Sequence, residues 1–121
     1  MVRVQTVTQL FTAAKALSCG FRPVGNRLAI VTNGGGPGVM AADRAADLGL
    51  AMATLSDATI EYLNQYLPPT WPHGNPVDII GDAMPERYAA AIEAVAADEA
   101  ADVILVLNCP TGLASSVDAA A

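Results

Sequence analysis

Apolar residues recur along this chain in two alternating patterns, one typical of buried strands and the other of amphipathic helices. Nearly continuous apolar runs predict strands over residues 27–32, 50–54 and 102–107. Apolar residues at helical spacing predict helices over residues 6–17, 36–48, 57–66 and 86–97. Strands that alternate with helices favour an open parallel α/β sheet with helices on both faces, and the continuous apolar strands favour burial on both sides.

The pattern stops before such a sheet is complete. Residues 75–82 predict one further brief extended segment, and Ser115 or Ser116 could cap a last helix that the chain barely begins. Doubly wound sheets usually contain more than three main strands. We therefore expect a sheet truncated after three main strands, as in a fragment of a longer polypeptide.

A glycine-rich turn lies between the strand at 27–32 and the following helix. Its candidate anion-binding residues are Asn33, Gly34, Gly35, Gly36, Gly38 and Val39. Glycine lets the backbone approach a ligand closely, and the first amides of a helix point outward with a partial positive charge. The turn therefore predicts a phosphate site, and Pro37 suits the first helical position. The alternative is a tight turn that needs glycine only for packing.

Two better-known phosphate motifs do not fit this turn. A P-loop requires Lys and then Ser or Thr after its last glycine, and neither follows Gly38. The dinucleotide fingerprint Gly-x-Gly-x-x-Gly lacks its third glycine here, and no acidic residue ends the next strand. The turn thus indicates what could bind without indicating a reaction.

Three loops should meet at the carboxyl edge of the sheet, where ligands of such folds bind. They are residues 33–38, 75–82 and 108–112, and their candidate supporting residues are Asn75, Asp78, Gly81, Asn108 and Thr111. Asp78 could orient a catalytic partner, or simply form an Asx turn, while Asp82 could cap the helix that starts near Pro85.

Composition and charge argue against several classes of protein function. The chain has 121 residues, is 53% hydrophobic and 15% charged, and has a net charge of −6. The negative charge argues against binding to nucleic acid or to an anionic membrane. No apolar stretch approaches the ~20 residues of a membrane helix, and no signal peptide opens the chain, so we expect a cytoplasmic protein.

Isolated side chains offer little catalytic chemistry. Cys19 and Cys109 lack metal-ligand spacing and are most simply free thiols, and no metal site is expected. His73 is best explained as a loop histidine beside Trp71, and Trp71 as either an interdomain anchor or a cap over the edge of the core.

The region from Arg27 to Asp118 resembles the NDP-forming acyl-CoA synthetases, which are related to succinyl-CoA synthetase. The motifs that carry the resemblance are VTNGGGPGVMAAD at 31–43, LPP at 67–69, NPVD with GD and ERY at 75–88, and NCPT at 108–111. The resemblance implies a flavodoxin-like three-layer domain over residues 27–121, incomplete at its C-terminal end. Residues 1–26 then correspond to a helix and linker from a preceding domain.

The resemblance also implies a chemistry. These synthetases convert acyl-CoA, ADP and phosphate reversibly into a carboxylic acid, ATP and CoA through a phosphohistidine held between two helix N-termini. The turn from Gly34 to Met40 looks like one of these helix starts. The full enzyme would use CoA and ADP or ATP with Mg, and the partners of this chain would be the CoA-binding and ATP-grasp domains or subunits. The family's phosphohistidine motif is absent here, so no catalytic residue is expected in this chain.

Two other functions remain open. The same module is similar to the synthetase-like region of Pat-type protein acetyltransferases, where it would be a non-catalytic regulatory module. A small anion-binding protein that forms oligomers through its sheet edge is the third interpretation.

Overall fold

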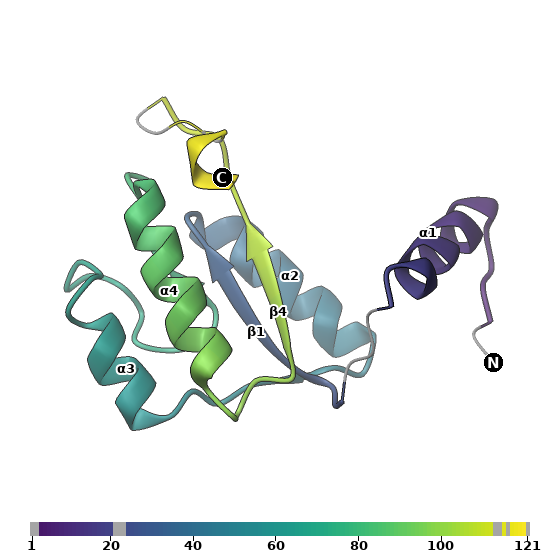
Figure 1. The fold of residues 1–121 in the computed structure, drawn as a ribbon, viewed down its shortest axis with the longest axis horizontal. Helices are drawn as coiled ribbons and strands as arrows, with labels where there is room; N and C mark the ends of the chain where they lie inside the picture. The colour runs from purple at the N-terminus through teal and green to yellow at the C-terminus, as the bar shows by residue number, and fades with distance from the viewer. Residues whose placement is uncertain (1–2, 21–23, 113–114, 116, 121) are drawn as a thin grey trace.

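The computed structural model describes residues 3–20, 24–112, 115 and 117–120. The chain alternates helices and strands in this order: α1 (Val7–Ser18), β1 (Arg27–Thr32), α2 (Gly35–Asp47), β2 (Ala51–Met52), α3 (Asp57–Leu63), β3 (Val77–Asp78), α4 (Pro85–Ala97), β4 (Val103–Leu107) and a 3-10 turn, η1 (Asp118–Ala120) (Figure 1).

The four strands form one parallel sheet around β1. On one side β4 pairs with β1 from Leu28↔Val103 to Thr32↔Leu107. On the other side β2 pairs with the beginning of β1 and β3 with its end. The predicted parallel α/β sheet is confirmed, and two short strands share one side of β1.

Helices cover both faces of the sheet, which gives three layers. Ala29 and Val31 point into the larger core, which α3 and α4 complete together with the fully buried Trp71 and Val77. Leu28 and Ile30 point to the opposite face, where Ala45 of α2 covers them. The alternation along β1 therefore serves two cores, as expected for a flavodoxin-like fold.

Several element boundaries differ from those predicted. The structure starts α2 at Gly35, so Pro37 takes the third helical position instead of the first, still within the turn whose amides lack helical partners. The predicted strand at 50–54 pairs only over Ala51–Met52. The predicted helix at 57–66 ends at Leu63, since Asn64 caps it and its Oδ1 accepts a hydrogen bond from Trp71 Nε1 at 2.8 Å.

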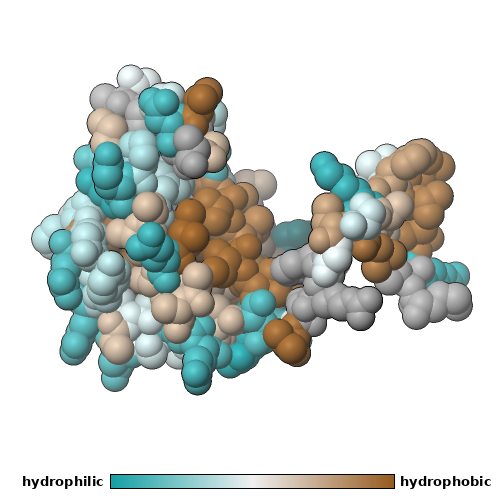
Figure 2. Space-filling model, viewed as in Figure 1, coloured by the Kyte–Doolittle hydropathy of each residue, from teal (hydrophilic) through white to brown (hydrophobic). Residues whose placement is uncertain are grey.

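The predicted burial of the strand at 102–107 is wrong for part of β4. Leu105 is 36% exposed and Val106 is 42% exposed. Among the described residues β4 pairs only with β1, which makes it an edge strand. Leu105 pairs with Ile30 on the α2 face and Val106 pairs with Val31 on the opposite face, so neither layer of helices fully covers this edge. Figure 2 shows hydrophobic surface gathered in the region where Figure 1 places β4.

Trp71 and α1 lie in opposite environments. Trp71 is 1% exposed and stacks on His73 with ring centroids 4.7 Å apart, which favours its role in the core over that of an exposed anchor. In contrast α1 has no buried residue and stands apart from the sheet (Figure 1). Over the described residues no helix is both long and apolar enough to cross a membrane.

Candidate site at the carboxyl edge of the sheet

The three loops predicted to converge do meet at the carboxyl ends of β1, β3 and β4. The side chain of Asn33 joins two of them, because its Oδ1 accepts from the Cys109 amide at 2.7 Å and its Nδ2 donates to the Cys109 carbonyl at 2.9 Å. A Cβ placed on Gly81 would stand 3.7 Å from the Asn33 carbonyl and 3.9 Å from the Thr111 methyl group. These contacts bring residues 33–38, 75–82 and 108–112 together.

The start of the glycine-rich turn is held by Thr32, a fully buried residue that the sequence analysis did not single out. Its hydroxyl accepts from the Gly34 amide and donates to the Gly34 carbonyl, both at 3.1 Å. A Cβ on Gly34 would approach the Cys109 sulfur to 2.8 Å, so any side chain there would have to displace the Cys109 thiol. Gly34 is therefore needed for packing, and its amide is engaged within the protein.

The end of the turn is also tightly packed. The Gly38 amide donates to the Gly34 carbonyl at 3.2 Å, and a Cβ on Gly38 would meet the Thr32 methyl group at 2.9 Å. Val39 follows one turn into α2 with a 58% exposed side chain. The expectation that glycine serves only packing thus describes Gly34 and Gly38.

Gly35 and Gly36, which lie between Gly34 and Gly38, have backbone amides that are free to bind a ligand. Within the described part of the chain the Gly35 and Gly36 amides make no hydrogen bond, since they belong to the first turn of α2. A Cβ on Gly36 would meet nothing within 4 Å. Of the six predicted anion-binding residues, Gly35 and Gly36 therefore contribute the unpaired donors, backed by the dipole of a 13-residue helix.

Asp78 lies beside these donors. Its Oδ1 accepts from the Ile80 amide at 2.9 Å, which confirms the predicted Asx turn. Its Oδ2 would be 3.1 Å from a Cβ on Gly35. A carboxylate at this end of a helix stabilises the helix but repels a second anion.

A pocket of about 460 Å³ opens beside the start of α2. Residues from three segments line it: Thr32, Gly35, Val39, Thr70, Pro72, Gly74, Asn75, Pro76, Asp78 and Ile80. The loop at 70–76, most of which lies outside the three predicted loops, therefore forms one wall of the site.

Asn75 and Asn108 hold the framework of the site together. Asn75 Oδ1 accepts from the Ile30 amide at 2.9 Å, and its Nδ2 donates to the carbonyls of Leu28 and Ala53 at 2.7 and 2.9 Å. Asn108 Nδ2 donates to the Tyr88 hydroxyl at 3.1 Å, and burial raises the pKa of Tyr88. Both amides were predicted as supporting residues, and both support through the protein backbone or core.

The prediction that Asp82 caps α4 is wrong. Met84 occupies the N-cap position without a side-chain hydrogen bond, and Asp82 instead pairs with Arg87 at 2.6 Å. Arg87 also donates to the Ile79 carbonyl at 3.0 Å. Arg87 therefore fixes the loop between β3 and α4, a role that its position in the sequence did not reveal.

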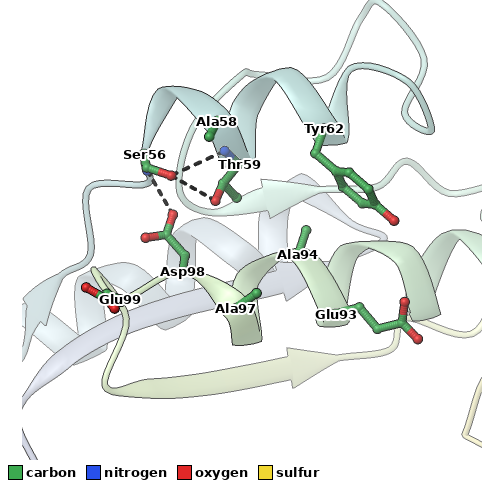
Figure 3. A pocket seen from close by; sticks show the side chains of 9 residues that line it. All are labelled: Ser56, Ala58, Thr59, Tyr62, Glu93, Ala94, Ala97, Asp98 and Glu99. Carbon is green, nitrogen blue, oxygen red and sulfur yellow. Dashed lines mark hydrogen bonds between the residues drawn. The ribbon is translucent and has the colours of Figure 1, made fainter.

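A second cavity, of about 660 Å³, lies between α3 and the C-terminal half of α4 (Figure 3). Its polar groups are satisfied: Asp98 accepts from the amides of Ser56 and Ala100, and the Ser56 hydroxyl accepts from the Thr59 amide. Burial raises the pKa of Asp98, but the hydrogen bonds that its carboxylate accepts lower the pKa by more. The pKa of Asp98 therefore lies below its usual value. Asp98 thus fastens the start of α3 to the end of α4, away from the glycine-rich turn.

No cluster of three or more His, Cys, Asp or Glu side chains in the described residues is arranged to hold a metal ion. Cys19 and Cys109 are free thiols, as predicted. The groups at the start of α2 that can act on a ligand include two backbone donors, the helix dipole and the Asp78 carboxylate.

Comparison with known proteins places this site in a family. Residues 28–111 match the model of the Ligase-CoA domain, a span that contains two of the three loops and all but the last residue of the third. The chain belongs to the Ligase-CoA domain family. The resemblance to acyl-CoA synthetases expected from the sequence is confirmed by this match together with the curated relatives.

Several curated relatives are ADP-forming acetate–CoA ligases. The chain is 40% identical to ligase I of Archaeoglobus fulgidus over 92% of this chain and 16% of that protein. It is 38% identical to the ligase II subunit alpha of Pyrococcus furiosus, over 84% of this chain and 22% of that subunit. The chain thus spans about a fifth of the curated relatives that it matches.

A solved relative shares the fold. The acetyl-coenzyme A synthetase 1 of Ca. Korarchaeum cryptofilum, determined in complex with phosphate and ADP, has a TM-score of 0.90 and 32% identity. The match covers 99% of this chain and 26% of that one. The Ligase-CoA domain described here is therefore equivalent to about a quarter of that synthetase chain.

Proposed function

We propose that this Ligase-CoA domain belongs to an ADP-forming acyl-CoA synthetase, in which the start of α2 binds the phosphoryl group of a phosphohistidine carried outside this chain. The observation that supports the proposal most is the pair of unpaired amides at Gly35 and Gly36, at the head of a 13-residue helix. Backbone donors of this kind stabilise a phosphoryl group without a metal ion.

Asp78 limits what the site can bind. Its Oδ2 lies beside Gly35, so a free anion would meet both the attraction of the amides and the repulsion of the carboxylate. Such a site binds free phosphate weakly. It suits a phosphoryl group that a neighbouring domain delivers on an imidazole ring, because the rest of the interface then contributes to binding.

In this proposal Asn33 and Thr32 do not contact the phosphoryl group and instead hold the backbone around the start of α2 in place. Asn33 ties the ends of β1 and β4 together, and Thr32 fixes the backbone of Gly34. Each of them keeps the first turn of α2 at a constant position relative to the incoming group. CoA and the adenine nucleotide with its Mg ion would bind to the remaining domains or subunits of the synthetase.

The test compares Gly35→Pro with Gly35→Ala in the complete synthetase that carries this segment. Both substitutions add a Cβ near Asp78, and both suit the first helical position, where Gly34 before it is extended at φ −144° and ψ 118°. Only proline removes the amide donor. We expect Gly35→Pro to slow phosphohistidine formation by about 100-fold relative to Gly35→Ala, as for loss of one preorganised donor.

Phosphoenzyme formation from radiolabelled ATP in single-turnover experiments gives these rates directly. Circular dichroism of both variants controls for folding. Equal rates in the proline and alanine variants would refute the proposed role of the Gly35 amide.

A further inference from the structure

Helix α1 has an apolar face that nothing in the described structure covers. Val7, Leu10, Phe11 and Leu17 lie on this face and are 70%, 54%, 71% and 68% exposed. A helix of 12 residues is marginal in water on its own, and most helical stability in proteins comes from packing of an apolar face. This face therefore requires a partner surface.

The charge of this segment differs from that of the rest of the chain. Residues 1–26 contain Arg3, Lys15 and Arg22 and no acidic residue, because all 12 Asp and Glu residues lie at or after Asp43. The segment is therefore basic on a chain whose net charge is −6. A partner that matches it combines an apolar surface with acidic residues at its rim.

The comparison with the solved synthetase indicates where such a partner is found. Because that alignment takes in 99% of this chain, it includes a counterpart of α1, yet it uses only 26% of the solved chain. The other three quarters of such a polypeptide are available to cover the helix. Its own sheet is not, since α1 stands beyond β4 and α2 (Figure 1) and has no buried residue.

We propose that α1 is a docking helix whose apolar face packs on an acid-rimmed surface of another domain of the same synthetase polypeptide. The inference rests on the proposed function only in requiring that the chain be part of such a synthetase. It assigns the segment before β1 a role in fixing the Ligase-CoA domain, and hence the start of α2, relative to its neighbour.

Hydrogen–deuterium exchange over residues 7–18 tests this proposal in the complete polypeptide and in the 121-residue chain. We expect exchange to be at least about tenfold slower in the complete polypeptide, where the face is covered. Phe11→Asp should abolish that protection, whereas the control Thr12→Asp, on the polar face, should preserve it. Lys15→Glu should weaken the protection more than Lys15→Gln does.

Two results would overturn the proposal. One is equally fast exchange in both proteins. The other is protection of α1 in the 121-residue chain together with a concentration-dependent sedimentation coefficient, which would show that a second copy covers the helix. Either result leaves the comparison of Gly35→Pro with Gly35→Ala unaffected, so failure of this inference is distinguishable from failure of the proposed function.

Discussion

The side-chain amide of Asn75 fills the gap in the sheet between the end of β2 and the start of β3. Its three hydrogen bonds reach the amide of Ile30 and the carbonyls of Leu28 and Ala53. The residue was predicted at the site because it lies on a polar loop. Its role was not predictable, since its partners lie 22 to 47 positions away along the chain.

Asn75→Ala should lower the free energy of unfolding by about 3 kcal/mol, because it leaves the buried Ile30 amide without its partner and removes the side-chain donor to the Ala53 carbonyl. Asn26→Ala is the matched control, since the exposed Asn26 amide makes a single long contact of 3.4 Å with the Gly49 carbonyl. Urea unfolding of both variants measures the difference. A loss below about 0.5 kcal/mol for Asn75→Ala would contradict the bridging role.

The roles of single glycines in the glycine-rich turn were also only partly predictable from the sequence. Its composition predicted an anion site, and the pattern of glycines alone could not separate donors from packing positions. Thr32 and Cys109 make that distinction, because they crowd Gly38 and Gly34 and leave Gly36 open. Those contacts arise from the neighbouring strands and are not encoded within the turn.

At the scale of elements, α2 lies close to the sheet because its sheet-facing residues are small. Gly38→Ala should destabilise the protein by about 1–3 kcal/mol, because its Cβ would meet the Thr32 methyl group at 2.9 Å. Gly36→Ala, two residues earlier in the same helix, has open space and should stabilise by up to about 1 kcal/mol. Thermal unfolding measures both, and the same sign for the two substitutions would disprove this packing of α2.

The beginnings of β1 and β4 are joined by Arg27 and Asp102. Arg27 donates from its backbone amide and from Nε to Asp102 Oδ2, and from its Nη2 to Oδ1 at 2.7 Å. These hydrogen bonds lower the pKa of Asp102 to about 2. The pair was not predicted, because its members lie 75 positions apart and become neighbours only when the two strands pair.

This pair has a consequence for acid stability. The pKa of Asp102 is below the ~3.9 of an unfolded chain, so its contribution is complete above about pH 4 and is lost as the pH falls towards 2. Asp102→Asn should therefore flatten the decline of stability in that range. The control Asp47→Asn removes an exposed pair with Arg44 at 3.5 Å and should leave the decline unchanged. Urea unfolding from pH 2 to 5 measures both, and unaltered pH dependence in Asp102→Asn would contradict this linkage.

At the scale of the whole molecule, the alternation of strands and helices predicted the parallel three-layer architecture correctly. The 3.6-residue spacing along α2 and α4 and the apolar run of β1 carry that prediction. Extended segments were predicted at 50–54 and 75–82, but the division of one side of β1 between β2 and β3 was not predictable, because the sequence of a strand does not reveal which part of its neighbour it pairs with. The exposure of β4 depends on which elements flank it in space, and a strand's own composition does not reveal its neighbours.

The whole molecule presents three surfaces of different chemistry. The carboxyl edge offers the two amides of α2, the face of β4 offers partly exposed apolar side chains, and α1 offers an apolar face on a basic segment. In the proposed synthetase we expect the carboxyl edge to bind a phosphoryl group and the other two surfaces to contact other parts of the protein. We therefore expect this chain to bind and position the phosphoryl group and another domain to carry the reactive histidine.

The most direct test of that assignment is a crystal structure of the complete synthetase trapped as its phosphoenzyme. We expect phosphoryl oxygens within about 2.7–3.2 Å of the backbone nitrogens of Gly35 and Gly36, the range for N–H···O hydrogen bonds. A phosphohistidine held by other groups, with the start of α2 facing solvent, would contradict it.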